Sequence, residues 1–157
     1  MKGVIVAGGL GTRLYPLTQA TNKHLLPVYD KPMVFYPIET LVKAGIQEVL
    51  IVVGGPHAGD FIRVLKNGKE LGLKHMEFAY QEGEGGIAAA LSLAEDFADG
   101  GSVAVILGDN TTDADISRAV KEFKGGGVVF LKKVADPKRF GVPVFEGEKI
   151  IRIERSE

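Results

Sequence analysis

The stretch "AGGLGTRLYPLTQATNKHLLPV", Ala7–Val28, decides the fold of this chain. It continues the short apolar run "KGVIV", which is rich in β-branched residues and typical of a strand. Three glycines lie within four positions, and the cations Arg13 and Lys23 follow them. This order is typical of a loop that holds phosphate, because glycine lets backbone N–H groups approach phosphate oxygens closely.

The spacing of this loop does not fit two common phosphate-binding motifs. A Walker-type loop needs Gly-Lys-Ser or Gly-Lys-Thr, whereas here Gly11 precedes Thr12 and Arg13. A dinucleotide fingerprint counted from Gly9 and Gly11 needs a glycine at position 14, which is Leu14. From spacing alone, a glycine-rich turn that binds no ligand stays open as the alternative.

The composition sets bounds on the class of protein. With 157 residues, 45% hydrophobic and 25% charged, the chain has the length and character of one globular domain. A formal charge of −1 argues against broad nucleic-acid binding, and the absence of cysteine excludes disulfides and thiolate metal sites. No apolar segment approaches the roughly 20 residues that span a bilayer, and the chain begins in a strand-like run rather than a leader. We expect no membrane contact and a cytoplasmic location.

Short apolar runs alternate with helix-like patterns along the chain. Continuous apolar runs are typical of strands buried on both faces of a parallel sheet, and they occur at 3–7, 48–53, 102–107 and 127–134. Helical spacing of apolar residues occurs at 36–46, 60–68, 85–101 and 113–127. The pattern predicts an α/β fold, with a Rossmann-like, mostly parallel sheet flanked by helices. A hairpin of two short strands is expected at 140–154, with its turn at Glu146–Glu148.

A carboxylate follows the third apolar run, in "ILGDN". Asp109 is expected at the carboxyl end of this strand, where open α/β sheets bind ligands. A carboxylate in that place can hold Mg²⁺ against phosphate oxygens, since magnesium usually takes one or two carboxylates plus substrate and water. Taken by itself, the pair Asp109-Asn110 is equally typical of a turn or a helix cap.

Taken together, these stretches resemble the sugar-nucleotidyltransferases. The opening motif of that family, GGxGTRLxPxT followed by Lys and Leu-x-Pro-Val, stands here as "GGLGTRLYPLT", Lys23 and "LLPV". The resemblance continues in order through "YDKPMVFYPIETLVKAGI", "VVGGPHAGDF", "YQEGEGGIAAALSLAEDF" and "ILGDN", and so covers almost the whole chain. Within the family, the wording is most similar to the glucose-1-phosphate thymidylyltransferases.

This resemblance implies an activity. The chain would transfer a thymidylyl group from dTTP to glucose 1-phosphate, giving dTDP-glucose and pyrophosphate, with Mg²⁺ as cofactor. Two alternatives stay open. One is a uridylyltransferase that uses UTP, because thymine and uracil differ by one methyl, worth only about 1–3 kcal/mol in a hydrophobic pocket. The other is a nucleotide-binding fragment or remnant without catalysis.

The resemblance also implies the site residues. Catalysis would rest on Arg13, Lys23 and Asp109, and Asp109 would hold the metal. The nucleotide would be bound by Gly8, Gly9, Gly11, Thr12, Arg13, Gln81 and Gly86. The sugar phosphate would be bound by Lys23, His24, Asn110 and Gly141. These roles suit the residue types, since the Arg13 fork grips two phosphate oxygens and the Gln81 carboxamide offers a pyrimidine both a donor and an acceptor.

The end of the chain departs from the family pattern. After the strand that matches "KIIRI", family members carry Glu-Glu-Lys-Pro, whereas here Glu154 is followed by Arg155, Ser156 and Glu157. We therefore expect residues 1–157 to form an incomplete nucleotidyltransferase-type domain, truncated on its C-terminal side. Binding of dTTP should survive better than turnover. Sheet edges that the remaining strands would cover should be open, so we expect a homo-oligomer.

Overall fold

The computed structural model of the chain describes residues 1–83, 85–138 and 140–155, so Ser156 and Glu157 of the departing tail lie outside the described residues. The chain divides into two compact units, Met1–Gly125 and Gly126–Glu157, which are described separately. No helix in the described ranges is both long and apolar enough to cross a membrane.

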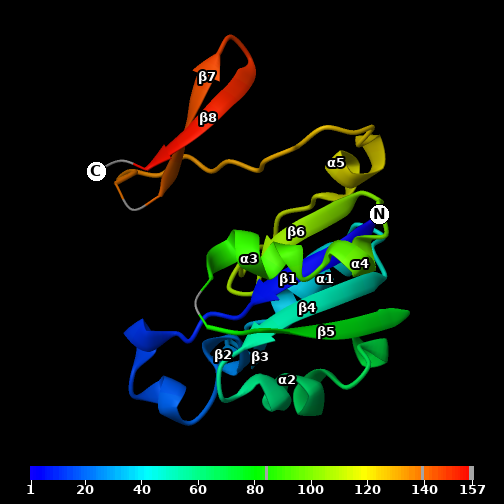
Figure 1. Cartoon of the computed structure of the whole chain (residues 1–157), viewed down its shortest axis with the longest axis vertical. Helices are drawn as coiled ribbons and strands as arrows, with labels where there is room; N and C mark the ends of the chain where they lie inside the picture. The colour runs from blue at the N-terminus through cyan, green and yellow to red at the C-terminus, as the bar shows by residue number, and fades with distance from the viewer. Residues whose placement is uncertain (84, 139, 156–157) are drawn as a thin grey trace. The chain divides into compact units, whose positions relative to one another are not determined.

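The first unit is built on a parallel sheet of four strands (Figure 1). The strand order is β5-β4-β1-β6, with β1 at Lys2–Ala7, β4 at Glu48–Gly54, β5 at His75–Gln81 and β6 at Val103–Leu107. Ile5 in β1 is paired with Ile51 on one side and with Ile106 on the other. The strands expected at 3–7, 48–53 and 102–107 are therefore confirmed.

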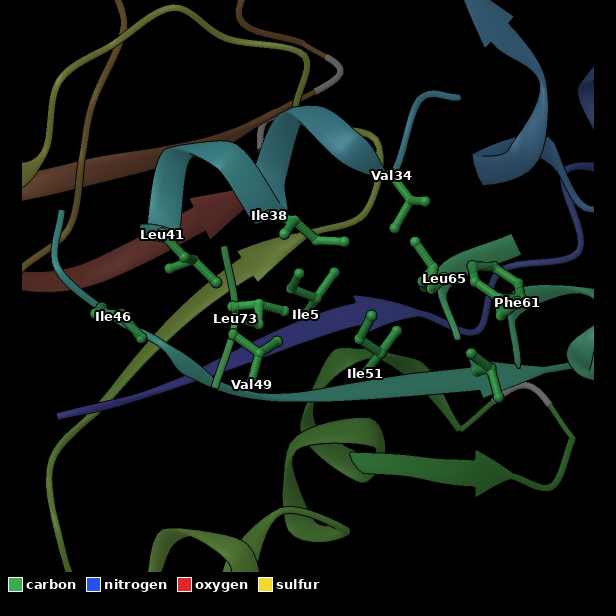
Figure 2. Close-up of a cluster of buried hydrophobic side chains, with 12 residues drawn as sticks. Ile5, Val34, Ile38, Leu41, Ile46, Val49, Ile51, Phe61, Leu65 and Leu73 are labelled. Carbon is green, nitrogen blue, oxygen red and sulfur yellow. The ribbon is translucent and has the colours of Figure 1, made fainter. Parts of the chain in front are cut away.

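Alternate residues of the central strands enter two separate cores. Ile5, Val49 and Ile51 pack with α1, Phe35–Lys43, and α2, Ala58–Leu65 (Figure 2). On the opposite face, Val4, Leu50 and Val52 pack with α3, Gly86–Ser92, and α4, Glu95–Ala98. Helices thus cover both faces of the sheet, and the predicted α/β class is confirmed. Each fully buried aliphatic side chain contributes about 1.5–3 kcal/mol, which explains why continuous apolar runs form the central strands.

The helices follow the predicted apolar spacing. Pro37 lies in the first turn of α1, where an N–H group has no helical partner, and Ile38 and Leu41 of that helix are fully buried. The pattern at 85–101 forms two helices, α3 and α4, rather than one. The pattern at 113–127 forms α5, Ser117–Glu122. The remaining short elements are β2 at Pro27–Val28, β3 at Lys31–Pro32, and four 3₁₀ turns: η1 at Thr12–Leu14, η2 at Leu17–Gln19, η3 at Lys23–Leu25 and η4 at Lys69–Leu71.

Strand β5 is absent from the sequence prediction. Exposed His75 and Glu77 alternate with the inward Met76 and Phe78. Within the described residues this strand pairs only with β4, and it forms one edge of the sheet. An edge strand with one wet face lacks the continuous apolar run on which the other strands were predicted.

The second unit contains one antiparallel hairpin, formed by β7 at Gly141–Glu146 and β8 at Lys149–Arg155. Its turn includes Gly147, whose φ of 61° suits glycine, so the predicted hairpin is confirmed. The strand expected at 127–134 is wrong, because no strand is assigned there and Val128–Leu131 are exposed. β-branched residues favour a strand, but a strand forms only where a neighbour supplies its hydrogen bonds.

Candidate functional site

The four parallel strands end at the same edge of the sheet, and their ends are closely packed. A Cβ built on Gly54, at the end of β4, would lie 3.0 Å from the Gly8 carbonyl oxygen and 3.1 Å from the Gln81 carbonyl oxygen. Because both neighbours are backbone atoms, Gly54 allows the ends of β1 and β5 to approach each other. This is the edge at which open α/β sheets bind ligands.

The glycine-rich loop leaves β1 at this edge. Gly11 has a φ of 67°, and a Cβ there would lie 2.8 Å from Lys23 Cβ. The Thr18 hydroxyl donates to the Gly11 carbonyl oxygen over 3.2 Å, which fixes the turn. Thr12 and Arg13 follow in the short turn η1 and are exposed. The left-handed backbone and the close contact both require glycine at position 11.

Lys23 and Asp109 meet above the strand ends, although 86 positions separate them in the chain. Lys23 Nζ donates to Asp109 Oδ2 over 2.7 Å, and the two side chains are 24% and 39% exposed. Burial raises the pKa of the Asp109 carboxyl, but the hydrogen bond and charge of Lys23 outweigh burial and hold that pKa below its usual range. The structure therefore brings together two of the three residues predicted for catalysis, with the carboxyl ionised.

Gln81 ends β5 and is engaged with two of the predicted glycines. Its Nε2 donates to the Gly86 carbonyl oxygen over 3.0 Å, and a Cβ on Gly8 would lie 2.6 Å from its Oε1. Gly86 begins α3 with a φ of 75°, and among the described residues no atom beyond its chain neighbours and its own helix backbone lies within 4 Å of the place where its Cβ would stand. The predicted base-binding residues Gln81 and Gly86 thus lie together beside the glycine-rich loop, with open space at Gly86.

The residues predicted to bind a sugar phosphate are placed differently from one another. Asn110 is exposed and follows Asp109 directly. His24 is only 2% exposed, and its ring contacts Asn22 and lies beside Phe61 and Gly108 instead of facing solvent. Gly141 begins β7 in the second unit, where a Cβ would lie 2.8 Å from Ile153 Cγ2.

The sequence prediction omits several residues of this edge. Asn22 is 4% exposed and caps η3 by accepting from the His24 backbone N–H, and Gly108 lies against the His24 ring. An asparagine directly before "KHL" is a capping signal that the sequence does contain. A hollow of about 320 Å³ has no such signal, because distant segments line it: Leu10, Thr12, Tyr15, Thr18, Gln19, Asn22, Gly54, Pro56 and His57.

Asp109 is the residue of this edge whose chemistry fits a metal. Within the described residues, no group of three or more His, Asp or Glu side chains gathers as a metal cage. Magnesium does not need one, since it usually binds one or two carboxylates together with substrate phosphates and water. An ionised, partly exposed carboxylate beside a glycine-rich loop fits such a metal.

Comparison with known proteins agrees with this geometry. The family model described as "Nucleotidyl transferase" matches residues 2–155. A glucose-1-phosphate thymidylyltransferase from an Actinoplanes species is 44% identical over 98% of this chain and 52% of its own length. The enzyme of that name from Neisseria gonorrhoeae is 41% identical over 93% of this chain and 52% of its own length. The chain therefore spans about half the length of the curated relatives it matches.

Solved structures give the same result. A crystal structure from Bacillus anthracis, described as a candidate glucose-1-phosphate thymidylyltransferase in complex with sucrose, matches with a TM-score of 0.94 and 45% identity. The match covers 100% of this chain and 65% of the chain from Bacillus anthracis. A UDP-glucose pyrophosphorylase at 24% identity, with a TM-score of 0.64 over 76% of this chain and 51% of its own, shares the fold. On the match of the family model to residues 2–155, the chain belongs to the nucleotidyl transferase family.

Proposed function

We propose that this chain provides the nucleotide-binding part of a glucose-1-phosphate thymidylyltransferase, which makes dTDP-glucose and pyrophosphate from dTTP and glucose 1-phosphate. One observation carries the proposal: the glycine-rich loop, the Lys23–Asp109 pair and the Gln81–Gly86 contact lie at one edge of the sheet. The names of the relatives from Actinoplanes and Neisseria support the choice of substrates.

The reaction needs two anions to be held in line. A phosphate oxygen of glucose 1-phosphate attacks the α-phosphorus of dTTP, the new P–O bond forms, and the bond to the bridging oxygen breaks so that pyrophosphate leaves. The protein contributes mainly positioning and charge compensation. Backbone N–H groups of Gly8, Gly9, Gly11 and Thr12 would hold the triphosphate. The exposed guanidinium of Arg13 would grip two of its oxygens, as its planar fork allows.

The Lys23–Asp109 pair would exchange partners when the nucleotide binds. In the free chain each neutralises the other over 2.7 Å. A phosphate oxygen is an equally good partner for the Lys23 ammonium, which would then release the Asp109 carboxylate to hold Mg²⁺. Bound there, Mg²⁺ would offset the negative charge of the phosphates. Both side chains are partly exposed, so the exchange needs little rearrangement of the surrounding core.

Recognition of the base and the sugar completes the proposal. Gln81 Nε2 would exchange its bond to the Gly86 carbonyl oxygen for a bond to the pyrimidine, while the open space at Gly86 admits the nucleoside. Contacts of the sugar phosphate with Lys23 and Asn110, a cytoplasmic location and a homo-oligomeric state are part of the same proposal.

Calorimetric titration of the purified chain with dTTP and Mg²⁺ tests this function, with UTP titrated in parallel. We expect dTTP to bind more tightly than UTP, which lacks the thymine methyl and carries a 2′-hydroxyl; the methyl alone is worth about tenfold or more if the site encloses it. Equal affinities would favour the uridylyltransferase alternative. The variant Asp109→Asn should bind dTTP with a weaker dependence on Mg²⁺. No binding by well-folded chain would overturn the assignment of the glycine-rich loop.

Release of pyrophosphate after addition of glucose 1-phosphate to the same sample distinguishes an active thymidylyltransferase from a nucleotide-binding fragment without catalysis. Binding followed by release supports the thymidylyltransferase activity of the chain itself. Binding without release supports nucleotide binding by a part that needs further segments for turnover.

A further inference from the structure

Asn22 is a buried amide that the proposed chemistry does not use. It is 4% exposed, and its Oδ1 accepts from the His24 backbone N–H over 3.0 Å and lies 2.7 Å from His24 Nδ1. Its Nδ2 makes a longer contact of 3.5 Å with the Gly9 carbonyl oxygen. A buried polar side chain needs hydrogen-bond partners that offset its desolvation. Here the partners are His24, which directly follows Lys23, and Gly9, which lies in the glycine-rich loop.

The contact with Asn22 defines the state of the His24 ring. Because the Asn22 oxygen accepts from a backbone N–H, the ring nitrogen that faces it must donate, so Nδ1 carries the proton of the neutral ring. Burial and, to a lesser extent, the charge of Lys23 lower the pKa of His24 to about 4, which keeps the ring neutral at pH 7. The ring is thus held in one orientation by a single hydrogen bond.

The His24 ring packs against Gly108, the residue that precedes Asp109. A Cβ built on Gly108 would lie 2.8 Å from His24 Cδ2 and 2.9 Å from Ala7 Cβ, so the ring fills the space beside this glycine. On another side the ring lies 6.3 Å from the Phe61 ring, between centroids. Lys23 precedes His24 in the chain and Asp109 follows Gly108. The contact of His24 with Gly108 therefore sets how far apart the backbones of Lys23 and Asp109 stand.

We propose that Asn22 and His24 form a buried positioning pair that holds Lys23 opposite Asp109 by seating the imidazole ring on Gly108. Neither residue touches a substrate in this assignment, so His24 acts on the site through its neighbours. The importance of this pair for nucleotide binding rests on the proposed function, whereas its effect on the Lys23–Asp109 distance does not.

A zero-length carbodiimide cross-link tests the positioning directly. The reagent joins a carboxylate to an amine with loss of water, so its yield reports how often Lys23 and Asp109 are in contact. The Lys31–Glu39 pair is a matched internal reference, because its atoms lie 2.6 Å apart and its side chains are 28% and 46% exposed. The ratio of the two cross-linked peptides, measured by mass spectrometry, corrects for reagent and for total folded protein.

In Asn22→Ala we expect this ratio to fall about fivefold or more, the factor that matches the loss of one capping hydrogen bond. In Gly108→Ala we expect it to fall as well, because the new Cβ would lie 2.8 Å from His24 Cδ2 and displace the ring. Asn22→Ser keeps an acceptor for the His24 N–H and should recover part of the yield. Leu73→Ala is the control, since it removes a buried side chain just before β5, at the end of the sheet away from Asp109, and should leave the ratio unchanged. Unchanged ratios in both Asn22→Ala and Gly108→Ala would overturn the proposal.

Titration with dTTP and Mg²⁺ on the same variants links positioning to binding. We expect Asn22→Ala to lower the affinity for dTTP with Mg²⁺, because Lys23 and Asp109 would no longer be held together where the phosphates and the metal bind. Leu73→Ala should bind dTTP as the unmodified chain does. If the unmodified chain binds no dTTP while the cross-link still responds to Asn22→Ala, the proposed function fails and the positioning pair stands. If dTTP binds and the cross-link does not respond, the reverse holds.

Discussion

Arg13 lies two residues after Gly11, whose left-handed backbone turns the loop, and its side chain is exposed. If the guanidinium grips the phosphates of dTTP, Arg13→Ala should weaken dTTP binding by about 10–100-fold, which corresponds to the loss of hydrogen bonds between charged groups. Calorimetry on folded protein measures this. Arg63→Ala is the control, because Arg63 is an exposed arginine on α2 whose side chain is 74% exposed. Unchanged affinity in Arg13→Ala would show that the assigned role is wrong.

A second prediction for a single residue is that His24 makes the free energy of unfolding depend on pH. Its pKa is lowered from 6.5 to about 4 in the folded chain, so between these values the unfolded chain binds a proton that the folded chain does not. The contribution of the neutral ring is therefore complete above pH 6.5 and is lost as the pH falls toward 4. Between pH 7.5 and 5 the loss should reach about 2 kcal/mol.

Urea unfolding of the chain and of His24→Gln at both pH values measures this contribution, because glutamine does not titrate. We expect the free energy of unfolding to fall further in the unmodified chain than in His24→Gln. Equal losses in the two proteins would mean that His24 is not buried in its neutral form.

At the scale of elements, the junction of β1, β4 and β5 depends on Gly54. In Gly54→Ala the new Cβ would lie 3.0–3.1 Å from two backbone oxygens, so the strand ends must separate, and with them Gly8 and Gln81. We expect lower stability and weaker dTTP binding, measured by thermal unfolding and calorimetry.

Gly59→Ala is the matched control for that substitution. Gly59 lies within α2 with no atom within 4 Å of its missing Cβ, and alanine is the better helix former by about 1 kcal/mol. It should raise stability and leave dTTP binding unchanged. If the two glycine substitutions behave alike, the close packing of the strand ends does not matter.

At the scale of the whole molecule, the second unit carries a run of exposed apolar side chains. Val128, Val129, Phe130 and Leu131 are each more than half exposed. A contiguous apolar segment with high strand propensity and unpaired backbone favours self-association. Phe130→Asp should therefore shift the chain toward monomer in sedimentation velocity, whereas Ile62→Asp, at an isolated exposed position on α2, should not. A monomer at all concentrations would contradict the predicted homo-oligomer.

The sequence by itself determined the class of fold and the loop that defines the family. The continuous runs of β1, β4 and β6 and the spacing of Ile38 and Leu41 in α1 predicted buried strands and an amphipathic helix, because burial repeats with the period of each element. The glycines of the opening loop were equally readable, since the conformation of Gly11 is a local property.

Only the tertiary structure decided which of these residues meet. The Lys23–Asp109 pair spans 86 positions, and the seat of His24 on Gly108 joins the same two segments. His24, which the sequence suggested as a ligand contact, is buried. Residues 127–134 have a high strand propensity but form no strand, because no neighbouring strand pairs with them in the described structure. Periodicity and propensity act over a few neighbouring residues, whereas hydrogen-bond partners and burial depend on what the folded chain brings alongside.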